Sequence, residues 1–310
     1  MRERKKRPYK PEVKREFNLG KLIERFGCED RCHAYLAELR WPDGVRCPRC
    51  KSGSVLHMRE RRLYECRDCS YQFTVRVGTI FHDSKLPLWK WFAAVYMMAE
   101  SKKGVSANQL KRMLNVSYKT AWYLCHRIRA TMKDEAPIGL RQIVEADETW
   151  VGGKATGRGK GNKDNKEVVV GAVERSAGGR VRLAMISNAG KRNIHRFIGE
   201  AVHGEAKEIH TDDWHAYDGI ADDDTEHKVI NKKRQGWVHA NVHTNTIEGV
   251  WSLFKRSVVG SYHKLSAKHL PAYLDEMAFR YNNRENPYIF NETLRRLIAA
   301  EQLRYRRLTA

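Results

Sequence analysis

The sequence has no run of 18 or more apolar residues, which excludes a membrane-spanning helix. Its N-terminal stretch, MRERKKRPYKPEVKREF, is basic but lacks the apolar core of a secretory signal. Internal repeats and low-complexity tracts are also absent, which excludes a repeat architecture. The chain therefore has the features of a globular protein without a membrane partner.

Acidic residues are scarce relative to basic ones. The 310 residues include 37 Asp and Glu against 58 Lys and Arg, which gives a formal net charge of +21. Such an excess favours a polyanionic partner, and double-stranded DNA has about one phosphate charge per 1.7 Å of helix axis. A basic protein that is merely soluble, or one bound to ribosomes, is the alternative. The length suffices for two or three modules.

The seven cysteines are odd in number, which argues against a complete disulfide framework and for a reducing, intracellular compartment. Four of them, Cys47, Cys50, Cys66 and Cys69, form two C-x2-C pairs with 15 residues between the pairs. Four thiolates complete a tetrahedral zinc shell, which leaves no open position for water. We therefore predict a structural Zn²⁺ in a zinc ribbon. Cys28 and Cys32 lie outside the pattern and are expected to be buried thiols.

The segment 104–132 has the pattern of a helix-turn-helix. Ser106 is placed to cap one helix and Ser117 a second, with Asn115 and Val116 in the turn between them. The first residues of the second helix would then enter the major groove of DNA. These expected DNA-binding residues are Ser117, Tyr118, Lys119 and Thr120. An ordinary helical hairpin within a core is the alternative.

Beyond Pro137 the pattern changes to alternating strands and helices, which predicts an α/β fold with a mixed sheet. The glycine-rich, basic segment 153–166 is expected to be a mobile loop. The expected strands are 143–147, 167–176, 180–187, 207–212 and 227–231, and the expected helices are 191–202, 246–258 and 266–282.

Three acidic residues are placed so that the fold can bring them together. Asp147 and Asp212 each end an expected strand, and Glu248 lies in the first turn of a helix. Converging carboxylates repel one another unless cations bind between them, and oxygen ligands suit Mg²⁺ or Mn²⁺. Lys255 follows Glu248 by seven positions and shares its helix face, where it could contact a DNA phosphate.

Several residues near these acids have less specific roles. Because neighbouring strand residues face opposite ways, one acid of each pair Asp147/Glu148 and Asp212/Asp213 must point away from the site. Structural roles are expected for the nearby histidines, with proton transfer or phosphate contact as the alternative. Core positions are expected for the nearby tryptophans, with base stacking as the alternative. These residues are His210, His215, His243, Trp214 and Trp251.

The two C-x2-C pairs, with the motifs EADETWVGGK, HTDDWHAY and NTIEGVWSLFKR, resemble the insertion-sequence 1595 family of DDE transposases. The resemblance runs from the zinc ribbon to about Arg284. It implies an RNase H-like catalytic fold, binding of terminal inverted repeats, and divalent-metal-dependent release of 3′-hydroxyl ends for transfer into target DNA. It also implies a homodimer or higher assembly on DNA, in the cytoplasm at the nucleoid.

By these motifs the metal-binding triad is Asp147, Asp212 and Glu248, holding two Mg²⁺ or Mn²⁺ ions, with Lys255 as a basic helper. Because family members vary between Asn and Glu at the third position, Asn245 is the alternative to Glu248. We prefer Glu248, since a carboxylate binds the metal more strongly than an amide oxygen.

Two other functions remain open from the sequence: an RNase H-like nuclease or resolvase that only hydrolyses DNA, and a non-enzymatic zinc-ribbon DNA-binding regulator. The domain division that we predict is a basic flexible arm (1–18), a short helical segment (19–44), the zinc ribbon (45–78), the helix-turn-helix domain (86–134), the RNase H-like catalytic domain (140–290) and a C-terminal helical tail (291–310).

Overall fold

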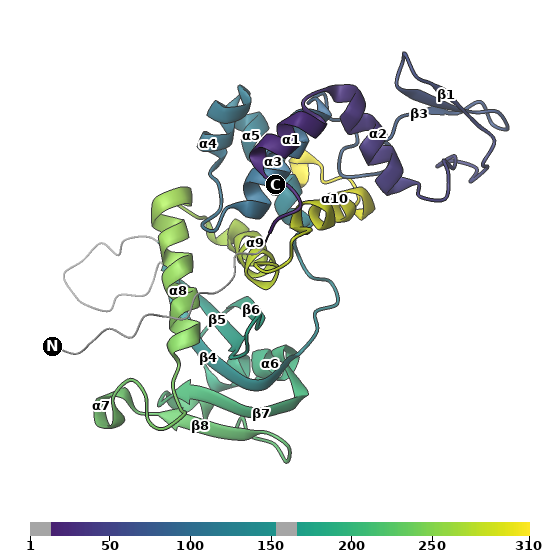
Figure 1. The fold of residues 1–310 in the computed structure, drawn as a ribbon. Coiled ribbons are helices and arrows are strands. Elements are labelled where there is room, and N and C mark those ends of the chain that lie inside the picture. Colours follow the sequence, from purple (N-terminus) through teal and green to yellow (C-terminus); the bar gives the residue numbers. More distant parts are fainter. Residues whose placement is uncertain (1–13, 153–165) are drawn as a thin grey trace.

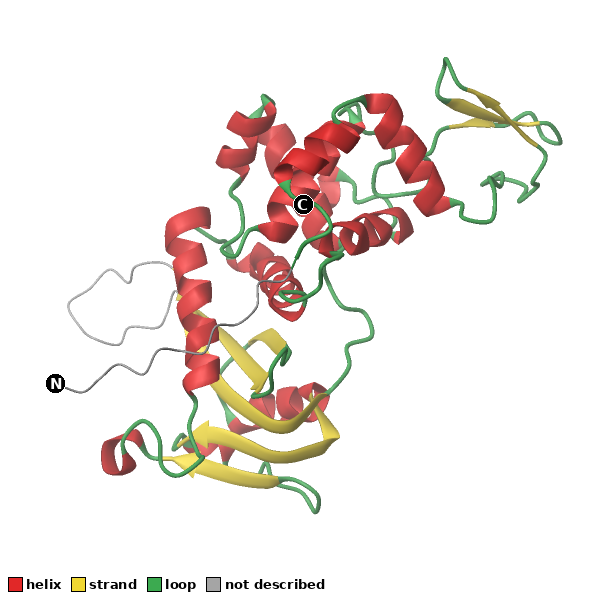
Figure 2. Cartoon of the chain, in the orientation of Figure 1, coloured by secondary structure: helices red, strands yellow, loops and turns green. Residues whose placement is uncertain are grey.

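The computed structural model describes residues 14–152 and 166–310. Helices gather at one end of the molecule, a small three-stranded unit projects beyond them, and a five-stranded sheet forms the other end (Figures 1 and 2). The predicted loop 153–166 lies almost wholly outside the described residues, as do the first thirteen residues of the predicted arm. Within the described ranges, no helix has the length and apolarity needed to cross a membrane.

The helical end is built around one apolar core. Its elements are α1 (Leu19–Phe26), α2 (Glu29–Arg40), α3 (Leu88–Glu100), α4 (Ala107–Leu114), α5 (Tyr118–Ala130) and, from near the end of the chain, α10 (Ile289–Ala299). The rings of Phe26 and Phe92 lie 5.0 Å apart, and Phe290 of α10 lies 5.9 Å from each of them. Residues more than 190 positions apart therefore share this core. Cys32 is buried as expected, whereas Cys28 is exposed, because it precedes α2 rather than packing inside it.

Helices α4 and α5 begin at the two serines that the sequence singled out. The Oγ atoms of Ser106 and Ser117 each accept a backbone N–H three residues further on, both at 3.1 Å. Asn115 ends α4 in a left-handed conformation with φ 48°, which an asparagine tolerates better than most residues. The helices and their turn thus lie where predicted, and their role in DNA binding stays a prediction.

Strands β1 (Val55–Met58), β2 (Leu63–Cys66) and β3 (Gln72–Phe73) form an antiparallel three-stranded sheet beside the helices. Tyr64 and Phe73 pair across β2 and β3 and pack with the buried cysteines 47 and 66. The predicted zinc ribbon is confirmed.

The larger sheet has the order β6-β5-β4-β7-β8. Its strands are β4 (Leu140–Gly152), β5 (Lys166–Glu174), β6 (Val181–Ile186), β7 (Val202–Asp212) and β8 (Glu226–Ile230). The first three in sequence pair antiparallel, and β7 and β8 run parallel to β4. Helix α6 (Lys191–Ala201) packs on one face; α8 (Asn245–Ser257) and α9 (Leu270–Asn282) pack on the other. The predicted mixed sheet flanked by helices is confirmed.

Close packing of α8 on the sheet depends on a glycine in β5. A Cβ atom at Gly171 would lie 2.7 Å from the ring of Trp251 on α8 and 2.9 Å from Leu183 on β6. Real Cβ atoms do not come that close, so any larger residue would push the helix away from the strand. Gly171 pairs with Asp147 across the sheet, so this contact lies beside the candidate site.

One prediction about β4 is wrong. Asp147 does not end the strand, which continues to Gly152 because β4 stays paired with β5 up to that residue. Pairing with β7, however, stops at Glu145 opposite His210. Asp147 therefore lies just beyond the parallel part of the sheet. Asp212 ends β7, as predicted.

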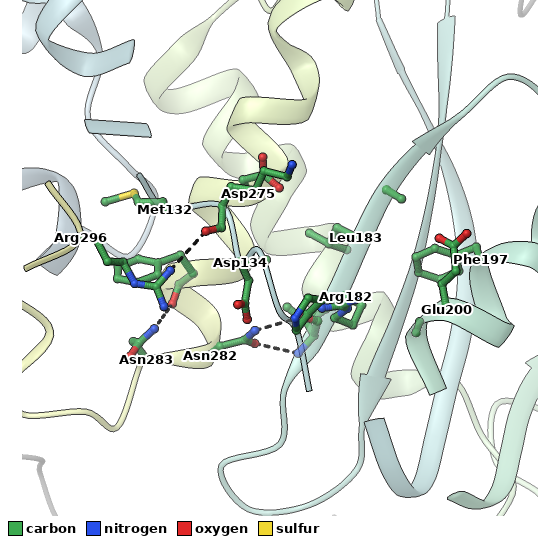
Figure 3. A pocket seen from close by; sticks show the side chains of 17 residues that line it. Met132, Asp134, Arg182, Leu183, Phe197, Glu200, Asp275, Asn282, Asn283 and Arg296 are labelled. Carbon is green, nitrogen blue, oxygen red and sulfur yellow. Dashed lines mark hydrogen bonds between the residues drawn. The ribbon is translucent and has the colours of Figure 1, made fainter. Parts of the chain in front are cut away.

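The helical end and the sheet meet through α9. Arg129 of α5 and Glu276 of α9 form a fully buried ion pair, and the Tyr262 hydroxyl donates to Glu276 at 2.9 Å. A cavity of about 190 Å³ lies at the same junction, lined by residues that include Met132, Asp275 and Arg182 (Figure 3). There the Asn282 side chain bonds both backbone groups of Val181, which fixes α9 against β6. This cavity lies apart from the candidate carboxylates, none of which lines it.

Candidate active site and metal centre

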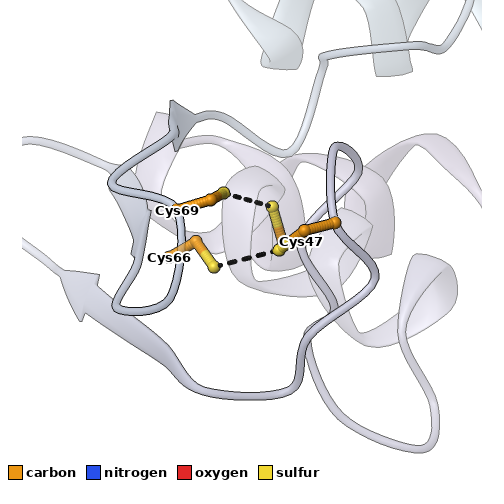
Figure 4. A group of neighbouring side chains, drawn as sticks. Cys47, Cys66 and Cys69 are labelled. Carbon is orange, nitrogen blue, oxygen red and sulfur yellow. Dashed lines mark hydrogen bonds between the residues drawn. The ribbon is translucent and has the colours of Figure 1, made fainter.

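The four cysteines of the ribbon lie close together at the ends of two turns (Figure 4). All four sulfur atoms lie within 4.8 Å of one another; Cys47 and Cys69 are separated by 3.7 Å, and Cys50 and Cys66 by 3.4 Å. Around a tetrahedral zinc with Zn–S bonds of about 2.3 Å, sulfur atoms are about 3.8 Å apart. The donor set and its spacing therefore fit a zinc ion with four protein ligands.

Asp147 and Asp212 occupy corresponding positions on neighbouring strands. Each lies two residues beyond the last parallel pair, Glu145 opposite His210, so both belong to the sheet face on which α8 packs. Trp251 of α8 donates its indole N–H to Asp147 Oδ2 at 3.0 Å. The adjacent Glu148 accepts the hydroxyl of Tyr217 at 2.8 Å, and Tyr217 is buried in the core on the opposite face of the sheet.

Glu248 faces the same region from the first turn of α8. Its Oε1 accepts from the Lys232 ammonium group at 2.5 Å and from the Thr244 hydroxyl at 3.3 Å. An open cleft of about 560 Å³ follows this face of the helix. The described residues that line it are Asp147, Glu148, Thr149, Glu248, Trp251, Ser252, Lys255, Arg256 and Val259.

Only some of the site residues predicted from the sequence line this cleft. Lys255 shares it with Asp147 and Glu248, as helical spacing of seven requires. Asn245 is exposed at the start of α8 and is not among the described lining residues. Asp212 also lies outside the lining. Among the described residues, the four cysteines form the only group of three or more Cys, His, Asp or Glu whose ligand atoms all lie within 4.8 Å of one another, so the three carboxylates are more widely spaced.

The carboxylates nevertheless interact electrostatically. Burial of Asp147, with the charges of Glu148 and Asp212 nearby, raises the pKa of its carboxyl to about 7, against an opposing effect of Lys232. A cation bound beside this carboxyl would favour its ionised form. Burial lowers the pKa of Lys232, but Glu248, Asp147 and Asp212 together raise it above its ordinary value. The ammonium group thus compensates all three acids.

A buried network under the site joins β4 to α8. Glu145, two residues before Asp147, accepts the backbone N–H groups of Thr246 at 2.7 Å and Ile247 at 3.0 Å, which lie in the first turn of α8. Arg175 donates to Glu145 at 2.8 Å and to Nδ1 of His210 at 2.8 Å. Nothing in the local sequence distinguishes Glu145 or Arg175, because only the folded chain brings residues 145, 175 and 246 together.

The remaining sequence expectations have mixed outcomes. His210 is fully buried between Arg175 and Glu208, and His243 lies 3.1 Å from Glu145. Both histidines therefore belong to the buried network that supports the site. Trp251 is buried, as expected. The prediction of a core position for Trp214 is wrong, because the residue follows the strand end and is 41% exposed, with its ring 4.5 Å from His215.

Comparison with known proteins identifies two domains. Residues 139–282 match the ISXO2-like transposase domain, and residues 27–72 match the transposase zinc-ribbon domain. A relative described as an uncharacterized protein in transposable element ISH50 of Halobacterium salinarum is 31% identical over 255 residues, which covers 76% of this chain and 84% of the relative.

A solved structure, the simian T-cell lymphotropic virus intasome in complex with PP2A regulatory subunit B56 gamma, has a chain that is 14% identical to this one. The match covers 55% of this chain and 63% of that chain, with a TM-score of 0.29. A likeness of this degree does not establish a shared fold.

Proposed function

This chain belongs to the insertion-sequence 1595 family of transposases, as its motifs predicted, and from that membership we propose a specific chemistry for it. It binds the terminal inverted repeats of a transposable element, cleaves phosphodiester bonds at the element ends in a divalent-metal-dependent reaction, and joins the released 3′-hydroxyl ends to target DNA. The nucleoid of the cytoplasm is the place where such a substrate is found.

One observation supports this proposal most strongly. Glu248 of α8 pairs with the Lys232 ammonium group at 2.5 Å, and the charges of Asp147 and Asp212, which lie on two neighbouring strands, also raise the pKa of that lysine. Acidic side chains on an exposed surface do not need such compensation, whereas three acids that share a cation form a cation-binding arrangement. Their oxygen-only donor set is the one that Mg²⁺ and Mn²⁺ prefer.

We assign Asp147, Asp212 and Glu248 as the ligands of two such ions. Bound about 3.5–4 Å apart, two ions would activate the attacking oxygen and stabilise the leaving oxygen of a phosphodiester. Glu248 is preferred to Asn245 as third ligand, because it lines the cleft with Asp147. Trp251 orients Asp147 through its indole N–H, and Lys255 is placed to bind a phosphate in the same cleft.

DNA binding is assigned to the helical end and the ribbon. The first turn of α5, with Ser117, Tyr118, Lys119 and Thr120, is the proposed element for the major groove. Beyond it α5 is covered: the ring of Trp122 lies 5.5 Å from His269 and 6.1 Å from Tyr305. The net charge of +21 supplies the sequence-independent attraction to phosphates. Since two element ends must be joined in one event, the working unit is a homodimer or a higher assembly on DNA.

Strand joining tests this function directly. The full chain is incubated with labelled pre-cleaved end DNA, supercoiled plasmid and Mg²⁺, and products are separated by denaturing electrophoresis. We expect label joined covalently to the plasmid. Hydrolysis without joining would favour a nuclease or resolvase. DNA binding without cleavage or joining, unchanged in Asp147→Asn, would favour a zinc-ribbon regulator.

A further inference from the structure

Lys232 has an unusual position for a residue in a basic run. It begins α7 (Lys232–Gln235), a one-turn helix directly after β8, near the ends of β7 and β8 (Figure 1). Its neighbours Lys233 and Arg234 are exposed, as expected for a solvated basic segment. The Lys232 side chain, by contrast, is only 29% exposed and lies 2.5 Å from Glu248 Oε1.

The surroundings of Lys232 position the ammonium group beside the acids. Asn231 caps α7 by accepting the backbone N–H groups of Lys233 and Arg234, at 3.1 and 3.0 Å, and its amide donates to Asp213 at 2.7 Å. Through Asp213, the segment that contains Lys232 is attached to the end of the strand that contains Asp212. The Lys232 nitrogen also lies 5.6 Å from the centre of the exposed Trp237 ring.

We propose that Lys232 is a displaceable counter-ion of the carboxylate site: it pairs with Glu248 until a divalent cation takes that carboxylate, and then pairs with a DNA phosphate. This inference rests on the proposed function, since it concerns the same three acids. Lys232 has no role as a proton donor in it; the group acts by its charge and its position.

Glu248 already has two hydrogen-bond donors, which favours displacement when a cation binds. One of its oxygens already accepts from both Lys232 and Thr244, so a cation that binds this carboxylate competes with the ammonium group. An ammonium group and a divalent cation that bind the same carboxylate repel each other, and this repulsion is stronger in a partly buried site than in water. Lys232 belongs to a one-turn helix, so a small movement of α7 suffices to release it. A DNA phosphate bound at the site would then supply an anionic partner in place of Glu248.

The test measures metal affinity without any reaction. Binding of Mn²⁺ to the zinc-loaded, DNA-free full chain is followed by electron paramagnetic resonance for the wild type, Lys232→Gln, Lys232→Arg and Lys233→Gln. If nine molecules in ten hold the lysine pair, its loss tightens Mn²⁺ binding about tenfold. We expect this gain for Lys232→Gln, wild-type affinity for Lys233→Gln, and affinity near wild type for Lys232→Arg, which keeps the charge.

The controls separate this inference from the proposed function. Unchanged or weaker Mn²⁺ binding in Lys232→Gln would overturn the counter-ion role, as would an equal gain in Lys233→Gln, which would indicate a general effect of net charge. Glu248→Gln reports on the site itself. If that variant binds Mn²⁺ as tightly as the wild type, the carboxylate site is not the metal site, and the proposed function fails together with the inference.

The second half of the proposal predicts a metal-dependent contact with DNA. Affinity for a short duplex of arbitrary sequence is measured against salt concentration by fluorescence anisotropy, with and without Mn²⁺. Each lost phosphate contact lowers the slope of log affinity against log salt by about 1. We expect Lys232→Gln to show this loss with Mn²⁺ and a wild-type slope without it. Equal slopes for the two proteins under both conditions would exclude transfer to a phosphate.

Discussion

The Glu145 carboxylate accepts the backbone N–H of Thr246 at 2.7 Å, and this bond ties the strand of Asp147 to the helix of Glu248. The same carboxylate accepts the Thr246 hydroxyl at 2.8 Å and the next backbone N–H of α8. A helix N-terminus favours a negative charge, so the contact is stabilising in charge as well as in geometry. Glu145, which is not one of the proposed metal ligands, thereby sets the distance between Asp147 and Glu248.

Glu145→Gln is expected to destabilise the sheet domain. The amide leaves Arg175 without a charged partner in a buried network, and breaking such a pair costs roughly 3–5 kcal/mol. We expect the free energy of unfolding to fall by at least about 2 kcal/mol, measured by urea unfolding followed by circular dichroism. Glu226→Gln is the control, because Glu226 pairs with Lys228 at the surface and its loss costs at most about 1 kcal/mol. Equal effects of the two substitutions would contradict a stabilising role for the contacts of Glu145 with α8 and Arg175.

Neutral substitution of the three acids is expected to abolish chemistry and preserve DNA binding. In Asp147→Asn, Asp212→Asn and Glu248→Gln, strand joining should fall by more than about 100-fold, since loss of even a supporting partner of a metal ligand costs 10–100-fold. Anisotropy with end DNA should stay within about twofold of wild type, because binding is assigned to other residues.

Two neighbouring residues serve as matched controls for the acids. Asp213→Asn removes a charge beside Asp212, but its partner is the Asn231 amide, so joining should stay within about tenfold of wild type. Asn245→Ala tests the alternative third ligand. A larger loss of joining in Asn245→Ala than in Glu248→Gln would reverse our assignment.

Zinc removal is expected to unfold the ribbon and leave the large sheet intact. The ribbon's buried core consists of Cys47, Tyr64, Cys66 and Phe73, so it has little to hold it without metal. We expect one zinc per chain by elemental analysis, and its loss in Cys66→Ser with faster hydrogen exchange only in β1–β3. Cys28→Ser is the control, since Cys28 is exposed and outside the cluster. Retained zinc in Cys66→Ser would contradict the assignment.

Stability should depend on pH through Asp275, at the junction of helices and sheet. Burial raises the pKa of its carboxyl to about 6, with Lys133 opposing the shift. The native state then binds more protons than the unfolded chain between pH 4 and 6, so stability decreases as pH rises through that range. Asp275→Asn should match the wild type at pH 4 and exceed it by about 1–3 kcal/mol at pH 7.5, in urea unfolding. A difference independent of pH would contradict this account.

The sequence predicts those features of the site that depend on local pattern. The cysteine spacing predicts the ribbon, Ser106 and Ser117 predict two helix starts, and the segment KEIHTD predicts a strand that ends at Asp212. The predicted end of β4 at Asp147 is wrong for a reason that lies outside the strand's own sequence, because pairing with β5 extends the strand to Gly152.

Tertiary relationships account for the features that the sequence could not predict. Lys232 stands in the run NKKRQ, where nothing local distinguishes it from the exposed Lys233. In the sequence, Glu145 looks like any acidic residue in a strand, and its role depends on its contact with the start of α8. Gly171 likewise looks like any small strand residue, and its role depends on its packing against Trp251. Each of these roles depends on a partner between 16 and 101 residues away.

The central claim is that Asp147, Asp212 and Glu248 hold divalent cations, and diffraction from crystals soaked in Mn²⁺ tests it most directly. We predict anomalous density for manganese between the three carboxylates, with oxygen ligands at about 2.0–2.2 Å and the Lys232 ammonium group withdrawn from Glu248. Manganese bound elsewhere, with Lys232 still paired to Glu248 at saturating Mn²⁺, would contradict it.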